Sequence, residues 1–190
     1  CTAIRGMPML HYVATCLWFA LPAYVGNMAP VFAKKLCKDR FATPVDLSRR
    51  VRGRRLSGSN KTYRGIVAAI IFSLAMVTVQ RALYGNSGVQ SISLVDYHNI
   101  NWLVFGVLMG LGAMLGDLAK SMAKRQLDKH PGESWRPFDQ VDFLIGAVLL
   151  TSVVYLTPAH VVAGILIIVP LVKVTVDHVG VYLHLYDSKW

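Results

Sequence analysis

Residues 116–142, GDLAKSMAKRQLDKHPGESWRPFDQVD, form a charge-dense stretch between two strongly apolar runs. Four polar residues in its first part have spacings i, i+3, i+4 and i+7, which place them on one face of a helix: Asp117, Lys120, Ser121 and Lys124. Asp139 and Asp142 share a face in the same way at the start of the next apolar run. Carboxylate oxygens are ligands that Mg²⁺ prefers, and lysine or arginine neutralises phosphate charge. The stretch therefore predicts a site for a metal ion and phosphate groups.

The same stretch also fits an ordinary cytoplasmic loop that joins two membrane helices. Lysine and arginine alone are enough to fix the orientation of such helices in a membrane. The three aspartates have no part in that signal, so their presence favours the metal and phosphate site over a plain loop.

The composition is that of a membrane protein. Of the 190 residues, 54% are hydrophobic and 16% are charged, with a mean hydropathy of +0.46. Soluble domains carry about 25% charged residues. In a soluble protein the net charge of +10 would indicate a nucleic-acid partner. Here the basic residues gather in two segments instead, which indicates membrane orientation and anionic ligands and no nucleic acid.

Five apolar segments of about 17 to 25 residues each have the length that a helix needs to cross the hydrocarbon core of a bilayer. A helix satisfies its backbone hydrogen bonds internally, as the bilayer core requires. The prediction is an all-α integral membrane bundle in a single domain, residues 1–190, with transmembrane helices at about residues 9–33, 65–84, 101–118, 140–156 and 161–185. Its two long loops are residues 34–64 and 119–139.

The basic residues also predict an orientation. Sixteen of the twenty lysines and arginines lie in residues 34–64 and 120–136. Residues 85–99 contain none, and neither does the turn at residues 157–160. Because cytoplasmic loops are enriched in lysine and arginine, we expect a multi-pass protein of the cell membrane. Its N-terminus lies outside, its C-terminus inside, and its charged site faces the cytoplasm.

The first apolar segment is interrupted by Pro22, Gly26 and Pro30, and it contains Asn27. Proline removes helix hydrogen bonds, and a polar amide in lipid is costly. Two interpretations stay equally open. In the first, neighbouring helices satisfy the backbone groups at a kink. In the second, a kinked helix lines a polar cavity that Asn27 faces.

The end of the first loop, GSNKTYRG at residues 58–65, offers several groups that bind phosphate. Backbone N–H groups, a hydroxyl and two cationic side chains lie together at the start of the second apolar segment. The spacing is not that of a P-loop, so the pattern is a weak phosphate signal. Its candidate substrate contacts are Ser59, Asn60, Lys61, Thr62 and Arg64.

Small residues repeat along the third apolar segment, with Gly112 and Gly116 four residues apart. Small residues let membrane helices approach closely, so we expect them to pack this helix and hold Asp117 firmly. In the fifth segment, Lys173 and Asp177 fit either mutual pairing or a place in the polar cavity. The three cysteines and six histidines have no ligand-like spacing, so neither a disulfide framework nor a zinc site is predicted.

The segments GDLAKSMAKRQLDKHPG and PFDQVDFLIGA together resemble the signature of the cytidylyltransferases that make CDP-activated lipids. In that family a Ser-x-x-Lys-Arg run precedes a glycine-containing loop and an Asp-x-x-Asp pair. The matching residues here are Ser121, Lys124, Arg125, Gly132, Asp139 and Asp142. PAYVGNMAPV at residues 22–31, NKTYRG at residues 60–65 and the short five-span layout look more specifically like the archaeal branch, the CDP-archaeol synthases.

The resemblance implies a nucleotidyltransferase of membrane phospholipid biosynthesis that joins CTP to unsaturated archaetidic acid, an isoprenoid ether lipid phosphate. The lipid phosphate would attack the α-phosphate of CTP and release pyrophosphate, with the isoprenoid chains between helices in the bilayer. This nucleophile is already anionic near neutral pH. The protein therefore has to supply positioning and charge neutralisation rather than a nucleophilic side chain.

The residues and the resemblance together predict three groups of side chains. The ligands of Mg²⁺ would be Asp117, Asp139 and Asp142. The side chains that hold triphosphate oxygens would be Lys120, Lys124 and Arg125. The remaining substrate contacts, to pyrophosphate, lipid phosphate or nucleotide, would be Asn27, Ser59, Asn60, Lys61, Thr62, Arg64 and Ser121.

Three other functions fit parts of the sequence. A small transporter would need a polar path through the bilayer, whereas charge here gathers at one surface and no inverted repeat is visible. A CDP-alcohol phosphatidyltransferase also uses aspartates at the membrane edge. That family has Asp-Gly-x-x-Ala-Arg before an Asp-x-x-x-Asp pair, but this chain has Asp139-x-x-Asp142. A non-catalytic assembly subunit would leave the acidic residues without a role.

Overall fold

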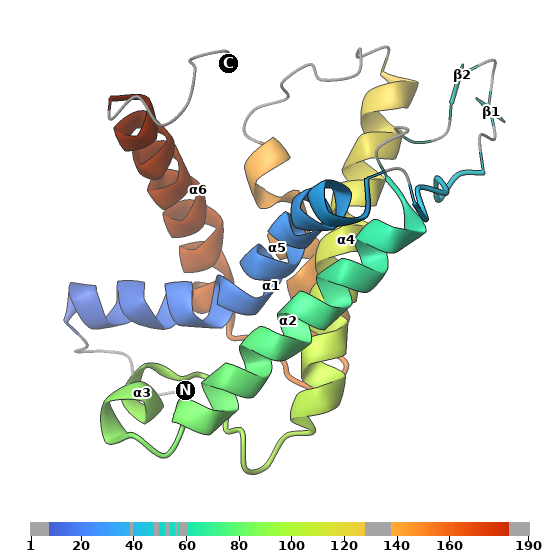
Figure 1. The fold of residues 1–190 in the computed structure, drawn as a ribbon. Coiled ribbons are helices and arrows are strands. Elements are labelled where there is room, and N and C mark those ends of the chain that lie inside the picture. The colour runs from blue at the N-terminus through green and yellow to red at the C-terminus, as the bar shows by residue number, and fades with distance from the viewer. Residues whose placement is uncertain are drawn as a thin grey trace.

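The structure is a computed structural model that describes residues 8–38, 40–47, 50–51, 54–55, 57, 61–127 and 138–182. Figure 1 shows helices with a short two-stranded ribbon at one end. Within the described residues the helices are α1 (Met9–Cys37), α2 (Tyr63–Leu83), α3 (Ser87–Ile92), α4 (Trp102–Gln126), α5 (Phe138–Thr151) and α6 (Ala159–Tyr182). The strands β1 (Arg50–Val51) and β2 (Arg54–Arg55) pair antiparallel.

The five longer helices fall on the five apolar segments, so the predicted helical class is confirmed. α1, α2 and α4 are long and apolar enough to cross a membrane. α5 has 14 residues, and the described apolar part of α6 is Ala159–Val172. The number of crossings and their direction therefore stay predictions.

Some helix ends differ from the predicted boundaries. α4 continues past residue 118 to Gln126, as the single helix face predicted for Asp117, Lys120 and Lys124 requires, so the helix extends into the segment assigned to the second loop. Residues 119–126, AKSMAKRQ, are mostly strong helix formers, and they carry the helix beyond its apolar run. α1 likewise continues past residue 33 to Cys37. α5 ends at Thr151, before residue 156, because β-branched residues and then Pro158 follow.

Side-chain caps fix where two of the helices begin. Thr62 accepts a hydrogen bond of 3.2 Å from the backbone N–H of Gly65 at the start of α2. Asn101 accepts one of 3.2 Å from the N–H of Val104 at the start of α4. Such a cap satisfies one of the unpaired N–H groups of the first turn. The cap on α2 also fixes the position of Lys61, which comes directly before it.

α4 packs against α1, α2 and α5 (Figure 1). Glycines allow its closest contacts. A methyl group on Gly112 would lie 2.6 Å from the carbonyl oxygen of Gly146 in α5, and one on Gly116 would collide with the carbonyl oxygen of Asp142. The close packing predicted at Gly112 and Gly116 is confirmed, and it fixes α4 against α5 beside the aspartates.

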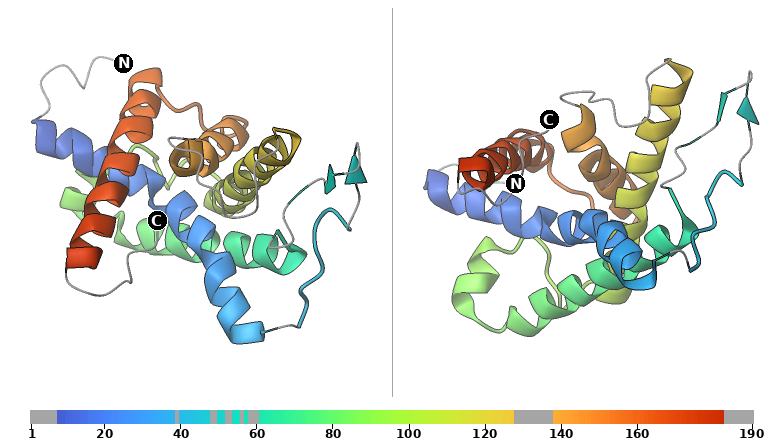
Figure 2. Two further views of the ribbon diagram at one scale, coloured as in Figure 1. Left: turned by 90° about the horizontal axis from the view of Figure 1, so that it is seen from above. Right: turned by 45° about the horizontal axis from the view of Figure 1, so that its top comes forward.

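α1 bends partway along its length (Figure 2), and its interior prolines are Pro22 and Pro30. Between them, Gly26 lies against both neighbouring helices. A methyl group on Gly26 would be 3.1 Å from a backbone oxygen of α2 and 3.5 Å from the Cα atom of Gly110 in α4. The missing side chain therefore lets α1 cross both helices closely, and Asn27 follows directly after this crossing.

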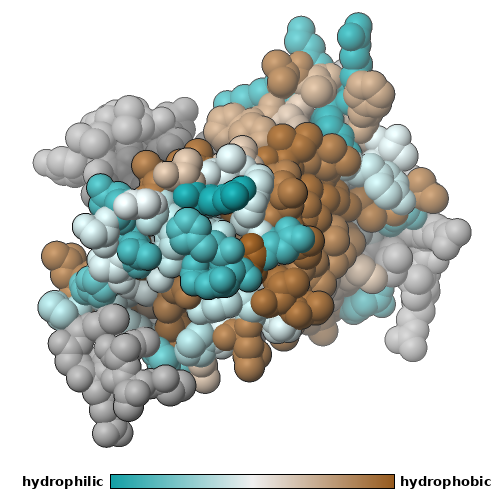
Figure 3. Space-filling model, turned by 90° about the horizontal axis from the view of Figure 1, so that it is seen from below, coloured by the Kyte–Doolittle hydropathy of each residue, from teal (hydrophilic) through white to brown (hydrophobic). Residues whose placement is uncertain are grey.

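The outer faces of the helices are apolar. Large hydrophobic side chains there are 56% to 68% exposed: Val67, Ile71, Leu149, Ile167 and Leu171. Figure 3 views the molecule from the end at which α3 lies and shows a hydrophobic band beside a more polar area. Extended exposed apolar surface marks contact with a membrane or a partner, and part of it lies on α2, which is long and apolar enough to cross a membrane.

A buried neutral network, formed by Trp18, Gln80 and Tyr97, lies near the end of α2 that adjoins α3. The Nε2 atom of Gln80 donates to the carbonyl oxygen of Trp18 at 2.6 Å, and its Oε1 atom accepts from the hydroxyl of Tyr97 at 2.7 Å. The ring of Tyr97 packs edge-on against those of Tyr84 and Phe105. The network thus joins α1, α2 and the segment before α4 without a formal charge.

Candidate active site

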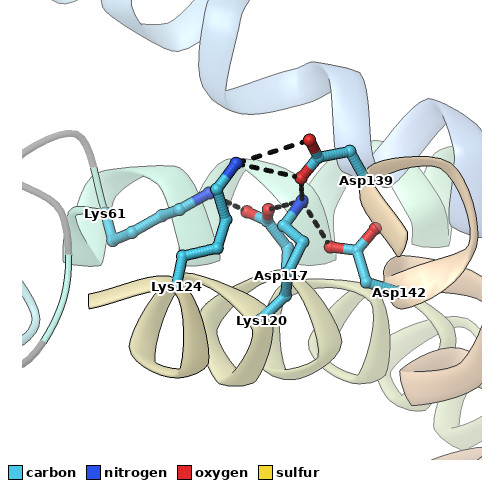
Figure 4. A network of polar contacts seen from close by, with 6 residues as sticks. All are labelled: Lys61, Asp117, Lys120, Lys124, Asp139 and Asp142. Atoms are coloured by element: carbon cyan, nitrogen blue, oxygen red, sulfur yellow. Dashed lines mark hydrogen bonds and ion pairs between the residues drawn. The ribbon is translucent and has the colours of Figure 1, made fainter. Parts of the chain in front are cut away.

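Six charged side chains meet where α4, α5 and the segment just before α2 come together (Figure 4). α4 supplies one aspartate and two lysines from a single face, as their spacing predicts. α5 supplies two aspartates from its first two turns. This charged cluster consists of Lys61, Asp117, Lys120, Lys124, Asp139 and Asp142. The structure therefore brings together the three predicted metal ligands and three of the predicted phosphate contacts.

Lys120 lies at the centre of the charged cluster. Its Nζ atom is 3.2 Å from Oδ1 of Asp117, 3.2 Å from Oδ1 of Asp139 and 2.8 Å from Oδ2 of Asp142. The side chain of Lys120 is 15% exposed, and those of the three aspartates are between 8% and 25% exposed. Three carboxylates thus converge on one cationic atom that is largely shielded from water (Figure 4).

Two further lysines flank this centre. Lys61 forms an ion pair with Oδ2 of Asp117. The Nζ atom of Lys124 lies 3.3 Å and 3.4 Å from the two carboxylate oxygens of Asp139. Within the charged cluster, three ammonium groups face three carboxylates, so the formal charges balance. Pairing of this kind is what allows charges to remain in a partly buried place.

The close approach of α4 and α5 makes this convergence possible. A methyl group on Gly146 would lie 2.7 Å from the backbone nitrogen of Gly116, so the two backbones are in contact there. Asp117 follows Gly116, and Asp142 lies one turn before Gly146. Asp139 stands in the first turn of α5, where the helix dipole stabilises a negative charge.

A cavity of about 460 Å³ opens beside the charged cluster, between α1, α4 and the start of α2. Its polar lining residues are Asn27, Lys34, Lys61, Thr62 and Asp117. Asn27 lines this cavity, as the second interpretation of the first apolar segment expects, and the lining also includes apolar residues of α1, α2 and α4. Sequence analysis missed Lys34, which it counted with the basic loop. Its position seven residues after Asn27, two helical turns, is the signal that places it on the same face.

The other predicted substrate contacts have different positions. The Nη1 atom of Arg64 donates to the carbonyl oxygens of Lys38 at 2.8 Å and Arg40 at 2.6 Å. Arg64 therefore ties the segment after α1 to the start of α2 and is not part of the charged cluster. Ser121 is buried and Arg125 is half-buried in the last two turns of α4. Of the residues singled out in the sequence, Ser59 and Asn60 lie outside the described ranges. The side chains of Lys173 and Asp177 lie outside them as well.

The donor atoms of the charged cluster fit a hard divalent cation, because all three acidic side chains offer oxygen. The Oδ2 atom of Asp142 is buried, and its ion-pair contact among the described residues is the one with Lys120. Within the described ranges, no three histidine, cysteine or acidic side chains are already arranged around a metal position. The aspartates instead surround an ammonium group, so direct contact with Mg²⁺ requires Lys120 to move.

Two apolar grooves lie near the site. One, of about 580 Å³, runs between α4 and α5 and reaches the charged cluster, since Lys120 and Asp142 line it. Its remaining lining is mostly aliphatic and includes Leu115, Ala119, Ile145 and Leu149. The other groove, of about 1000 Å³, lies between the C-terminal end of α1 and the start of α2, where Phe32 stacks on Phe72.

Comparison with known proteins identifies the family. A family profile described as CarS-like: CDP-archaeol synthase matches residues 9–190. The chain is 34% identical over 185 residues to the CDP-archaeol synthase of Methanoregula boonei, covering 90% of this chain and 99% of that protein. It is 33% identical to the enzyme of that name from Thermofilum pendens, with coverage of 94% and 81%. Identity to the one from Pyrococcus furiosus is 31%, with coverage of 95% and 97%.

A solved structure shares the fold. It was reported under the words "Structural insight into an intramembrane enzyme for archaeal membrane lipids biosynthesis", and it matches with a TM-score of 0.67 and 27% sequence identity. The match covers 85% of this chain and 91% of that one. The resemblance seen in the sequence is confirmed by the profile, by the relatives and by this fold. The chain belongs to the CarS-like family of CDP-archaeol synthases.

Proposed function

We propose that this protein transfers a cytidylyl group from CTP to unsaturated archaetidic acid, an isoprenoid ether lipid phosphate. The products are CDP-archaeol and pyrophosphate, and the reaction belongs to archaeal phospholipid biosynthesis. Family membership over residues 9–190 supports this activity. The structural observation that carries it is the convergence of three carboxylates on Lys120, beside the cavity that Asn27 lines and next to α2 and α4, which are long and apolar enough to cross a membrane.

The chemistry requires little from the protein beyond charge and position. An oxygen of the lipid phosphate forms a bond to the α-phosphorus of CTP, and the bond from that phosphorus to the bridging oxygen of the β-phosphate breaks. The attacking oxygen is already anionic, so no side chain has to remove a proton from it. Holding two polyanions together in line is the main barrier, and cationic groups placed in advance lower it.

The carboxylates of Asp117, Asp139 and Asp142 would hold Mg²⁺. Such a cation neutralises phosphate charge and polarises the phosphoryl oxygen when bound. The three side chains come from two helices that are in backbone contact at Gly116 and Gly146, so their spacing is set by rigid elements.

The cationic side chains of the site would bind the phosphates. Lys120 and Lys124, with Arg125 one residue further on α4, would hold triphosphate oxygens. Lys61 pairs with Asp117 and lines the cavity beside the charged cluster, so it fits either the pyrophosphate or the lipid phosphate. Asn27 and Lys34 line the same cavity from α1 and would contact nucleotide or headgroup.

The isoprenoid chains of the acceptor would lie between helices within the bilayer. The groove between α4 and α5 supports this placement, because its lining is mostly aliphatic while Lys120 and Asp142 are at its polar side. An acceptor lying there would have its chains in lipid and its phosphate at the charged cluster.

The membrane arrangement proposed is a single domain of five crossings with the active site on the cytoplasmic side. In Figure 1 the start of α2, the end of α4 and the start of α5 lie at the same end as β1 and β2, opposite α3. The two segments rich in lysine and arginine adjoin that end, which agrees with the preference of basic residues for the cytoplasm.

The activity is tested with purified protein in detergent, radiolabelled CTP and Mg²⁺, with archaetidic acid as acceptor and phosphatidic acid as a second acceptor. We expect a labelled CDP-lipid and one pyrophosphate for each product, and no reaction after chelation of Mg²⁺. A parallel incubation with CDP-lipid and an alcohol tests the alternative phosphatidyltransferase, which would release CMP. Absence of CDP-lipid and pyrophosphate with every phosphatidic-type acceptor would overturn the proposed function.

A further inference from the structure

Lys120 takes the place in the charged cluster at which the carboxylates meet. Its Nζ atom contacts one oxygen from each of the three aspartates at 2.8 Å to 3.2 Å. Bonds from Mg²⁺ to oxygen are shorter, about 2.0–2.1 Å. Each of the three oxygens therefore stands roughly 1 Å too far from the central position to bind Mg²⁺ there. The observed distances of 2.8 Å to 3.2 Å suit an ammonium group instead.

An ammonium group and a divalent cation cannot both occupy this position. They would compete for the same three oxygens, and at about 3 Å their mutual repulsion in a shielded place exceeds several kcal/mol. Removing Lys120 without a replacement would also leave three carboxylates facing two lysines. With Mg²⁺ in place of the ammonium group, the three carboxylates, two lysines and the divalent cation would carry a net charge of +1, which favours an incoming anionic phosphate.

We propose that Lys120 is an internal counter-ion that exchanges with the metal ion. In the ligand-free protein its ammonium group neutralises and positions the three carboxylates. When the site is loaded, the ammonium group is displaced and turns to the phosphate oxygens of the nucleotide. The proposal rests on the proposed function, since a metal-dependent transfer is what requires the exchange.

The flanking lysines make this exchange specific to Lys120. Lys61 and Lys124 contact Asp117 and Asp139 from the edges of the charged cluster, so these contacts can persist while the centre changes. Asp142, by contrast, forms its ion pair among the described residues with Lys120, so this is the contact that the exchange would break. The side chain of Lys120 also lines the groove between α4 and α5, and its four-carbon stem is flexible enough to change partners.

The first test measures binding of Mn²⁺, a paramagnetic substitute for Mg²⁺, to purified protein without nucleotide, using electron paramagnetic resonance. Lys120→Met should bind Mn²⁺ about tenfold or more tightly than the wild type, because the internal competitor is gone. Lys120→Arg retains the charge and should stay near the wild type. Lys124→Met removes the same charge one turn away, at the edge of the cluster, and should have a smaller effect. Equal or weaker Mn²⁺ binding by Lys120→Met would overturn the exchange.

The second test uses the wild-type protein, so it does not depend on the folding of a variant. Reaction of each lysine with an amine-selective reagent is followed by mass spectrometry, with the exposed Lys35 as internal reference. We expect Lys120 to react slowly without metal and several-fold faster at saturating Mg²⁺. A reaction rate for Lys120 that stays constant or falls on addition of Mg²⁺ would contradict its displacement.

The two proposals fail separately. If the wild type forms no CDP-lipid, the proposed function is wrong whatever Lys120 does. If the wild type forms CDP-lipid in a Mg²⁺-dependent reaction, but Lys120→Met binds Mn²⁺ no more tightly and the labelling of Lys120 ignores Mg²⁺, then the enzyme stands and the exchange is wrong.

Discussion

The charged cluster and the neutral network are both buried polar assemblies between helices, but their groups are satisfied in different ways. In the neutral network, the nitrogen and the oxygen of the Gln80 amide each have one partner, at 2.6 Å and 2.7 Å. In the charged cluster, the single ammonium group of Lys120 is shared among three carboxylates. The shortest of these contacts, 2.8 Å, is to the buried Oδ2 atom of Asp142.

This difference separates a structural role from a functional one. A neutral hydrogen bond in the interior contributes about 1 kcal/mol, and leaving one of its partners unpaired costs more. For buried ion pairs, the loss of hydration can cancel the attraction. A fold that needed only rigidity would gain little from six charges. Variants of the charged cluster should therefore lower the turnover of each folded molecule, whereas variants of the neutral network should lower stability and leave that turnover unchanged.

The largest effect is expected from Asp139→Asn. Asp139 contacts both Lys120 and Lys124, and it is a proposed metal ligand. The amide keeps the shape of the side chain but removes its charge, so we expect the turnover number to fall by about a thousandfold or more while the protein still folds. The measurement is CDP-lipid formation at saturating CTP, with size-exclusion chromatography and thermal unfolding as checks on folding.

Asp96→Asn is the matched control for that variant. It is the same chemical change on an exposed aspartate in the loop between α3 and α4, at the end of the molecule near α3. We expect turnover within about twofold of the wild type, as for most surface substitutions. Near-normal turnover in Asp139→Asn would remove the metal assignment.

The second largest effect is expected from Gly116→Ala, which changes the site without touching a charge. A methyl group there would collide with the carbonyl oxygen of Asp142, so α4 and α5 have to separate. Overpacking of this kind costs about 1–3 kcal/mol or more, and the moved carboxylates should lower turnover by about tenfold or more. Thermal unfolding and CDP-lipid formation measure the two losses.

Gly85→Ala provides the comparison for this packing prediction. No described atom outside its immediate neighbours lies within 4 Å of a methyl group placed on Gly85. We expect its stability to stay within about 0.5 kcal/mol of the wild type. If Gly116→Ala were equally harmless, close contact of α4 with α5 would not be what positions the aspartates.

Much of this fold could be predicted from the sequence because the bilayer limits the choices. Apolar runs long enough to cross a membrane have to be helices, and the five longer helices fall on those runs. The end of α4 could not be placed from hydropathy, since residues 119–126 are polar yet form helix. The relevant signals there were the helical spacing of Asp117, Lys120 and Lys124 and the helix propensity of the residues around them.

The membership of the site could also be predicted, but not its pairing. Spacing placed Asp117, Lys120 and Lys124 on one face, and the backbone contact of Gly116 with α5 brings the other two aspartates to them. The spacing of residues in the sequence does not determine whether a carboxylate binds a metal ion or forms an ion pair with a lysine. That outcome depends on side-chain length and on the distances between helices. The same limit applies to Arg64, whose basic charge suggested phosphate but which binds two backbone carbonyls.

A smaller effect, and an opposite pattern, is expected from Tyr97→Phe in the neutral network. Loss of the hydroxyl leaves the buried Oε1 atom of Gln80 without the donor that it has at 2.7 Å. Burial also raises the pKa of Tyr97, so its hydroxyl remains a donor throughout the physiological range. We expect a loss of about 1–2 kcal/mol in the free energy of unfolding and unchanged turnover per folded molecule. A loss of turnover without a loss of stability would remove the division between the two regions.

The smallest effect concerns Asp96, a carboxylate whose hydrogen-bond partners are neutral, unlike those of the charged cluster. The backbone N–H of His98 donates to it at 3.0 Å and the side-chain amide of Asn99 at 2.6 Å. These bonds favour the charged form, so the pKa of Asp96 lies below the ordinary aspartate value. Its small contribution to stability is therefore present above the unfolded pKa and is lost as the pH falls through the lowered folded pKa.

Carboxyl NMR of the protein in micelles, with Asp96→Asn to assign the resonance, measures this pKa directly. We expect a value below the ordinary one and no change in it when Mg²⁺ is added, because Asp96 lies in the loop near α3 while the proposed metal ligands lie on α4 and α5. In thermal unfolding, Asp96→Asn should lose slightly less stability on acidification than the wild type does, because the amide cannot be protonated in this range. A pKa at or above the ordinary value would show that neutral donors do not stabilise this carboxylate. A shift with Mg²⁺ would show that the ion also acts on carboxylates outside the charged cluster. The response to Mg²⁺ would then not distinguish Asp96 from the aspartates of the charged cluster.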